Sequence, residues 1–255
     1  MFFPWLASIL ALGGLAALFL VEVRDFGRGF HRFTGALVSL LLGLGLAGGA
    51  LHGPVGWMAL LACVGWVCLT AWGPISWVRP SLPVPLLLAC WAVLSGTAYP
   101  PAAPLLELRA WVVPGNTVAA ALLLGSVSLA MLLGHWYLVV PGLPIRHLLR
   151  MTHSLGLCLL LRVTIGVLSL ASSVPKPALG AVSSWEVAGV VGGFFFWQRV
   201  GIGQVAPAIL ACMVERTVRI HSTQSATGLL YVAIVFVLIG EMISRYLYVS
   251  MGIPQ

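Results

Sequence analysis

Three observations predict that this chain is all-α and crosses a membrane as a bundle of about eight helices, seven or eight in number. Of its 255 residues, 60% are hydrophobic and only 7% are charged, whereas about 25% of the residues of a soluble domain are charged. The apolar residues form runs of about 20, the length that crosses the hydrocarbon core as a helix. The basic residues cluster between alternate runs. No segment between the runs is long enough for a soluble domain, so we expect residues 1–255 to form one integral membrane domain.

Eight segments are the candidate spans. The first is expected to be retained rather than cleaved, because its positive charge follows the apolar run instead of preceding it. In the second, Gly45, Gly49 and Gly53 are spaced four apart, which predicts a face for close helix packing. The seventh is too long for an upright span and is expected to tilt or to kink at Pro207. The segments are 3–21, 34–52, 54–74, 83–99, 116–139, 153–172, 184–213 and 225–248.

The distribution of charge predicts the orientation of the bundle. Arginines follow the first, third, fifth and seventh spans, whereas the other connections carry only Arg109, opposed by Glu107, and Lys176. By the positive-inside rule, both termini should lie outside, in the periplasm if the membrane is a bacterial inner membrane. The cytoplasmic basic side chains are expected to contact membrane lipids or an acidic partner subunit, and nucleic-acid binding is not expected. The candidates for this docking are Arg28, Arg32, Arg146, Arg150, Arg216 and Arg219.

Four ionisable residues fall within the last three apolar segments and are candidates for quinone binding or proton transfer. Arg162 and Arg199 lie near the middle of their spans, Glu241 lies slightly toward the outside, and Glu186 lies near the outer end. A charge at this depth costs several kcal/mol, so it normally has a partner or a function. We expect Glu241 to neutralise one arginine and to leave the other for a ligand or a partner's carboxylate. The alternative is a purely structural Arg–Glu clasp between helices.

Two histidines near the cytoplasmic side are candidates for binding a haem or a quinone. His135 precedes the end of the fifth span and His153 begins the sixth, and neutral imidazoles ligate haem iron, bond quinone carbonyls or relay protons. Ordinary packing remains the alternative for both. The five cysteines show no CxxC spacing, so we expect no metal site. Motifs for a serine nucleophile, zinc hydrolysis or nucleotide binding are missing from the sequence, and no catalytic residue is assigned.

The last predicted span closes with GEMISRYLYVSMGIPQ, where Gly240 and Glu241 precede Arg245. This ending and the predicted topology of eight spans resemble the membrane-anchor subunits of molybdopterin oxidoreductases, the NrfD and DMSO-reductase-anchor group. The resemblance implies a quinol-binding anchor that exchanges electrons with an iron–sulfur or cytochrome partner and generally carries no haem. It also implies that Glu186 and Glu241 take up quinol protons, while Arg199 orients the headgroup or holds Glu241 ionised.

The leading hypothesis is therefore an integral membrane subunit of a multi-subunit electron-transfer complex, of respiratory or photosynthetic type. Such a subunit would anchor its partner subunits and bind quinone, without being an enzyme by itself. One alternative is a cofactor-free scaffold or assembly subunit. Two others are a b-haem subunit ligated by His135 and His153, and a small-solute transporter with an aqueous path at the level of Arg162 and Arg199.

Overall fold

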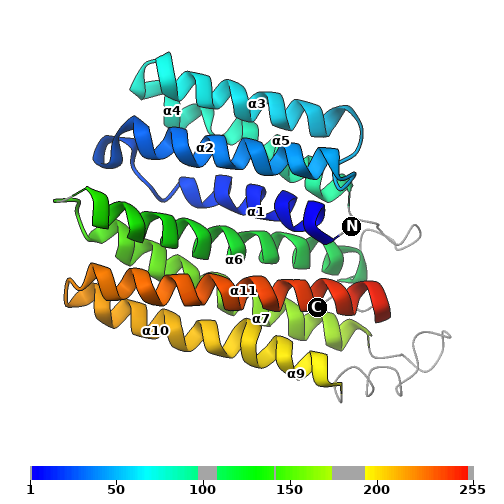
Figure 1. The fold of residues 1–255 in the computed structure, drawn as a ribbon. Coiled ribbons are helices and arrows are strands. Elements are labelled where there is room, and N and C mark those ends of the chain that lie inside the picture. Colours follow the sequence, from blue (N-terminus) through cyan, green and yellow to red (C-terminus); the bar gives the residue numbers. More distant parts are fainter. Residues whose placement is uncertain (1, 97–107, 141, 174–192, 252–255) are drawn as a thin grey trace.

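The structure is a computed structural model that describes residues 2–96, 108–140, 142–173 and 193–251. Every regular element in these ranges is a helix, and the helices lie side by side as a bundle (Figure 1), which confirms the predicted all-α class. The elements are α1 Phe2–Leu18, α2 Val23–Ala47, α3 Gly53–Trp72, α4 Ile75–Ser81, α5 Pro83–Ser95, α6 Leu108–Val139, α7 Arg146–Ser173, α9 Phe194–Val200, η1 Gly201–Val205, α10 Ala206–Arg219 and α11 Thr223–Met251.

Six helical segments of the described chain are long and apolar enough to cross a membrane, which indicates an integral membrane protein in contact with lipid. Two of the eight predicted spans have no counterpart among these six segments. The first, α1, has 17 residues, and the seventh is divided into α9, η1 and α10, with residues 184–192 outside the described ranges. The six segments are Val23–Ala47, Gly53–Trp72, Ile75–Ser95, Trp111–Val139, Arg146–Ala171 and Thr223–Ser250.

The predicted glycine face of the second span is wrong in part. Helix α2 ends at Ala47, and both Gly49 and Gly53 have positive φ angles of 70° and 69°. Glycine adopts a positive φ without a Cβ clash, so the chain turns at Gly49 after the end of α2 and again at Gly53, the first residue of α3. Only Gly45 stays on the helix, where an added Cβ would lie 2.2 Å from Ser8 Oγ. Of the three glycines spaced four apart, one therefore makes a packing contact and the other two lie in turns.

The break in the seventh span lies just before the predicted kink at Pro207. Pro207 is the second residue of α10, and the π-helical turn η1 directly precedes α10. Proline cannot donate a backbone hydrogen bond to the preceding turn, and a wider π turn accommodates that loss. The turn brings Gly203 against α11, because a Cβ at Gly203 would lie 2.6 Å from the Cα of Gly240. The two backbones touch without side chains between them.

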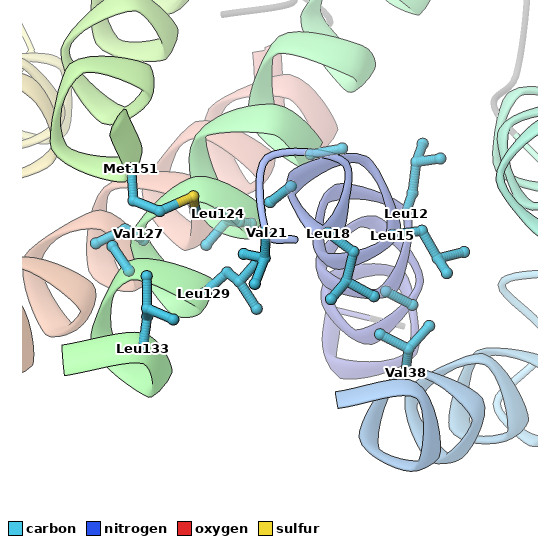
Figure 2. Packing of buried hydrophobic residues seen from close by; sticks show 14 of the residues in the cluster. Leu12, Leu15, Leu18, Val21, Val38, Leu124, Val127, Leu129, Leu133 and Met151 are labelled. Carbon is cyan, nitrogen blue, oxygen red and sulfur yellow. The ribbon is translucent and has the colours of Figure 1, made fainter. Parts of the chain in front are cut away.

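Helix α6 is the centre of the bundle, packed against α1, α7 and α11 (Figure 1). In Figure 2, leucines of α1 such as Leu15 and Leu18 and residues of α6 such as Leu124 and Leu129 belong to one buried cluster. Two glycines permit this approach: a Cβ at Gly125 of α6 would lie 2.0 Å from the carbonyl carbon of Gly13 in α1.

The turns α1–α2, α3–α4, α6–α7 and α10–α11 gather at one end of the bundle, at the left in Figure 1. The start of α1 and the end of α11 lie toward the opposite end. The turn end, here called the basic end, carries three carboxylates, those of Glu22, Asp25 and Glu215, and an excess of arginines. These arginines are Arg24, Arg28, Arg32, Arg79, Arg146, Arg150, Arg216 and Arg219.

The α1–α6 contact predicts the effect of enlarging one glycine. Gly125→Ala should lower the midpoint of thermal unfolding in detergent by several degrees, because overpacking costs about 1–3 kcal/mol. Gly65→Ala in α3 is the matched control, since an added Cβ there meets nothing within 4 Å. The control should leave the midpoint unchanged or raise it slightly, because alanine favours a helix over glycine. Equal midpoints for the two variants would contradict the close approach.

Candidate functional site

Arg162 of α7 is the largest fully buried side chain in the described part of the bundle, at 1% exposure. Its Nε and Nη2 donate to the two carboxylate oxygens of Glu241, each at 2.8 Å. Nη1 donates to Asn116 Oδ1 at 2.6 Å, and Nη2 also donates to Ser244 Oγ at 2.9 Å. The pairing confirms the prediction that Glu241 neutralises one arginine. The fork-to-fork geometry is the strongest arrangement available to an arginine and a carboxylate.

The partners of Arg162 come from two further helices and are themselves held in place. Glu241 and Ser244 are one turn apart on α11, and Asn116 lies in α6. The Asn116 amide donates Nδ2 to the Val112 carbonyl at 3.1 Å, which leaves Oδ1 to accept from Arg162. The cluster thus ties α6, α7 and α11 together, and removal of either charge would leave the other buried without compensation.

Arg199 of α9 is also buried, at 4% exposure, but its charge is not neutralised by an ion pair within the described chain. Its Nη2 has no hydrogen-bond partner among the described residues. The guanidinium lies beside α7, because a Cβ at Gly166 would be 3.6 Å from that Nη2. Arg199 is within electrostatic range of Arg162 and Glu241. Both arginines therefore lie in one region of the bundle.

The described cluster of Arg162, Arg199 and Glu241 carries one net positive charge inside the bundle. Both carboxylate oxygens of Glu241 accept hydrogen bonds from Arg162, so Glu241 is fully engaged by that arginine. Arg199 retains a donor that suits an anionic or carbonyl oxygen. The fourth predicted residue, Glu186, lies outside the described residues.

The two candidate haem or quinone histidines point to different partners. The Tyr231 hydroxyl of α11 lies 3.4 Å from His135 Nδ1, whereas His153 Nε2 lies 3.4 Å from Glu215 Oε1 of α10. Both side chains are exposed at the surface of the bundle.

An apolar groove of about 630 Å³ runs between α7 and the η1–α10 segment and ends at His153 and Glu215. We call it the α7–α10 groove. Gln204 of η1 and Thr152 of α7 add two further polar groups to an otherwise aliphatic lining. The lining extends from this end to Val163 and Val200, the neighbours of Arg162 and Arg199 in the chain. The lining also includes Cys212, which is an exposed residue.

Hydrogen bonds keep Glu215 ionised at the end of the groove. Arg219, one turn along α10, donates Nη2 to Glu215 Oε1 at 2.6 Å. This bond, followed by the one to His153, lowers the pKa of the Glu215 carboxyl below its usual range. An ionised carboxylate only accepts hydrogen bonds, so it favours a proton on Nε2 of His153 and leaves Nδ1 of that ring as an acceptor.

Several of the predicted docking arginines are used within the chain. Arg146 pairs with Asp25 at 2.6 Å and Arg150 pairs with Glu22 at 3.2 Å, which joins the start of α7 to the start of α2. Arg28 donates to the Ala71 carbonyl at 3.3 Å. Their neighbour His147 is fully buried and lies 2.5 Å from Asp25. The remaining members are Arg219, bonded to Glu215, and the exposed residues Arg32 and Arg216.

Four members of these sites are not predicted from the sequence: Asn116, Ser244, Gln204 and Glu215. Asn116 and Gln204 are amides within apolar runs, and this is a signal that could have been used. Ser244 is too common a residue type to stand out. Glu215 lies 62 positions from His153, and only the packing of α10 on α7 makes them neighbours.

Comparisons with known proteins add no assignment. No family model matches the chain, and no match was found among curated proteins or among solved structures. The resemblance of the last span to the NrfD and DMSO-reductase-anchor group therefore remains a prediction.

The different surroundings of the two arginines predict opposite effects of removing them. Arg162→Met should destabilise the protein by about 3–5 kcal/mol, because it strands the buried Glu241 carboxylate. Arg199→Met should leave stability unchanged or raise it, because it removes a buried charge that has no paired carboxylate in the described structure. Thermal unfolding in detergent measures both. A loss for Arg199→Met as large as that for Arg162→Met would show that Arg199 has an anionic partner.

Proposed function

We propose that this protein is an integral membrane subunit of a multi-subunit electron-transfer complex and that it binds quinol in the α7–α10 groove. The observation that carries the proposal is the apolar groove that ends at the hydrogen-bonded pair of His153 and Glu215. A quinol has a small aromatic head with two hydroxyl groups and a long apolar tail. Its binding site needs a lipid-accessible apolar channel with a few polar groups at one end.

The polar end of the groove is suited to taking a proton from a quinol hydroxyl. Nδ1 of His153 accepts that proton while Nε2–H remains bonded to the Glu215 carboxylate, which stabilises the imidazolium that forms. Glu215 is partly exposed and bonded to the exposed Arg219, so the proton has a short path to water. The second proton follows the same route after His153 has passed the first to water, and the two electrons pass to an iron–sulfur or haem centre, which we assign to a partner subunit.

The proposed topology has eight spans with both termini outside, in a bacterial inner membrane. It is supported by the arginine excess at the basic end and by the position of the start of α1 and the end of α11 at the opposite end (Figure 1). In this topology α1 and the α9–η1–α10 segment are the two further spans. His153 and Glu215 then face the cytoplasm, whereas the resemblance in the last span implies a quinol site on the outer side.

Substitutions at the polar end of the groove test the quinol site. In the complex purified through this chain, His153→Ala should lower quinol-dependent electron transfer about 100-fold, the usual contribution of a general base. Glu215→Gln should have a smaller effect in the same direction. His135→Ala is the matched control, because His135 is exposed and bonded to Tyr231 instead of lining the groove. Unchanged turnover in both groove variants would reject the site.

A cofactor-free scaffold is the second candidate function, and the saturated pairing of Arg162 favours it. In a scaffold, the buried charges only hold helices together, and the groove is filled by ordinary lipid. The same variants discriminate the two functions, because a quinol-binding subunit assembles normally and loses turnover. A scaffold would keep turnover in both variants, and extraction of the purified complex would yield no quinone.

A further inference from the structure

A second pocket, of about 760 Å³, lies at the basic end between the α1–α2 turn and α4. Its charged members are Glu22, Arg24 and Arg79, and Ser76 adds a hydroxyl group. The remaining lining is apolar: Phe19, Val23, Ile75, Pro80 and Pro83. This pocket shares no lining residue with the α7–α10 groove.

The charge in this pocket is positive once the ion pairs of the basic end are taken into account. Glu22 is paired with Arg150 of α7 at 3.2 Å, so its charge is already compensated. The guanidinium groups of Arg24 and Arg79 are exposed, and neither has an ion pair or a hydrogen bond with another described side chain. Arg24 and Arg79 are 55 positions apart in sequence, and both line this pocket. Their positive charges are not neutralised there.

The pocket combines these cations with an apolar surface. Ile75 is 45% exposed at the start of α4, and α4 leads directly into α5, so the apolar lining continues from the membrane interface into a candidate span. A soluble anion would use only the arginines. A phospholipid uses both parts, because its phosphate contacts the arginines and its acyl chain covers the apolar surface.

We propose that this pocket is a specific site for a glycerophospholipid with an anionic headgroup. Arg24 and Arg79 bind the phosphate from two sides, and Ile75 and Phe19 contact the first part of an acyl chain. The bound lipid links the α1–α2 turn to α4, two segments of the basic end that are far apart in sequence. This role is independent of quinol binding in the α7–α10 groove.

Native mass spectrometry of the purified protein with added lipid tests the site. Phosphatidylglycerol should bind at least tenfold more tightly than phosphatidylcholine. The double variant Arg24→Gln/Arg79→Gln should lose about 10- to 30-fold in phosphatidylglycerol affinity, as expected for two arginines near an anionic headgroup. The double variant Arg32→Gln/Arg216→Gln is the matched comparison for general attraction of lipid to this end. It removes the same charge at exposed arginines that are candidates for lipid contact at the surface but do not line the pocket. The affinity of the Arg32→Gln/Arg216→Gln variant for phosphatidylglycerol should change less than twofold.

Three results would overturn the proposal. Equal losses in the two double variants would show that the attraction is a general property of the basic end. An unchanged affinity in Arg24→Gln/Arg79→Gln would exclude these residues. Displacement of the lipid by millimolar inorganic phosphate, with no effect of Ile75→Ser on lipid affinity, would identify a simple anion site without an acyl-chain contact. Since Ile75 is partly exposed, the Ile75→Ser variant should still fold, and we expect it to weaken phosphatidylglycerol binding several-fold.

Discussion

The bidentate pair between Arg162 and Glu241 is the interaction on which the second half of the bundle depends. In a low-dielectric interior, neither charge is tolerated alone, so each fixes the position of the other. Asn116 and Ser244 accept further N–H groups of the guanidinium, and the cluster joins α6, α7 and α11 at one level. The backbone contact between Gly203 and Gly240 lies one residue from Glu241, so the π-helical segment packs against the same level of α11.

The polar residues of the second half of the bundle fall into two groups, those bonded around Arg162 and Glu241 and those at the end of the α7–α10 groove. At the level of the arginines, both carboxylate oxygens of Glu241 are bonded to the guanidinium of Arg162. Proton transfer requires a group that can change its charge, such as an imidazole near water. His153 is an exposed imidazole, and the lining of the α7–α10 groove extends from it to the residues beside the arginines. Arg199, buried beside Gly166, is the charged group of this region for which the described structure provides no counter-charge.

The arginines of the basic end are not equivalent, although they are indistinguishable in a loop-by-loop charge count. The pairs Asp25–Arg146 and Glu22–Arg150 hold the beginnings of α2 and α7 together across more than 100 positions of sequence. These exposed pairs contribute little stability individually, yet they compensate the acidic groups at this end. The positive charge that remains is therefore concentrated on other arginines, including the two that line the α1–α2 and α4 pocket.

The sequence by itself determined the helical class, the membrane location and the identity of Arg162, Arg199 and Glu241, because apolar runs and ionisable residues within them are local signals. The tertiary structure alone decided which arginine Glu241 neutralises, since this depends on the rotation of α7 and α9 about their axes. It also placed Glu215 beside His153, and it placed Arg24 and Arg79 in the lining of one pocket, although these residues lie on helices that are distant in sequence. The turn between α2 and α3 was also not evident in the sequence. Gly49 and Gly53 fit a helical spacing, and only their left-handed backbone shows where α2 ends and α3 begins. Hydropathy reflects the free energy of moving a residue out of water. The partner of a buried charged side chain depends instead on the distances between packed helices, which the periodicity of the sequence does not encode.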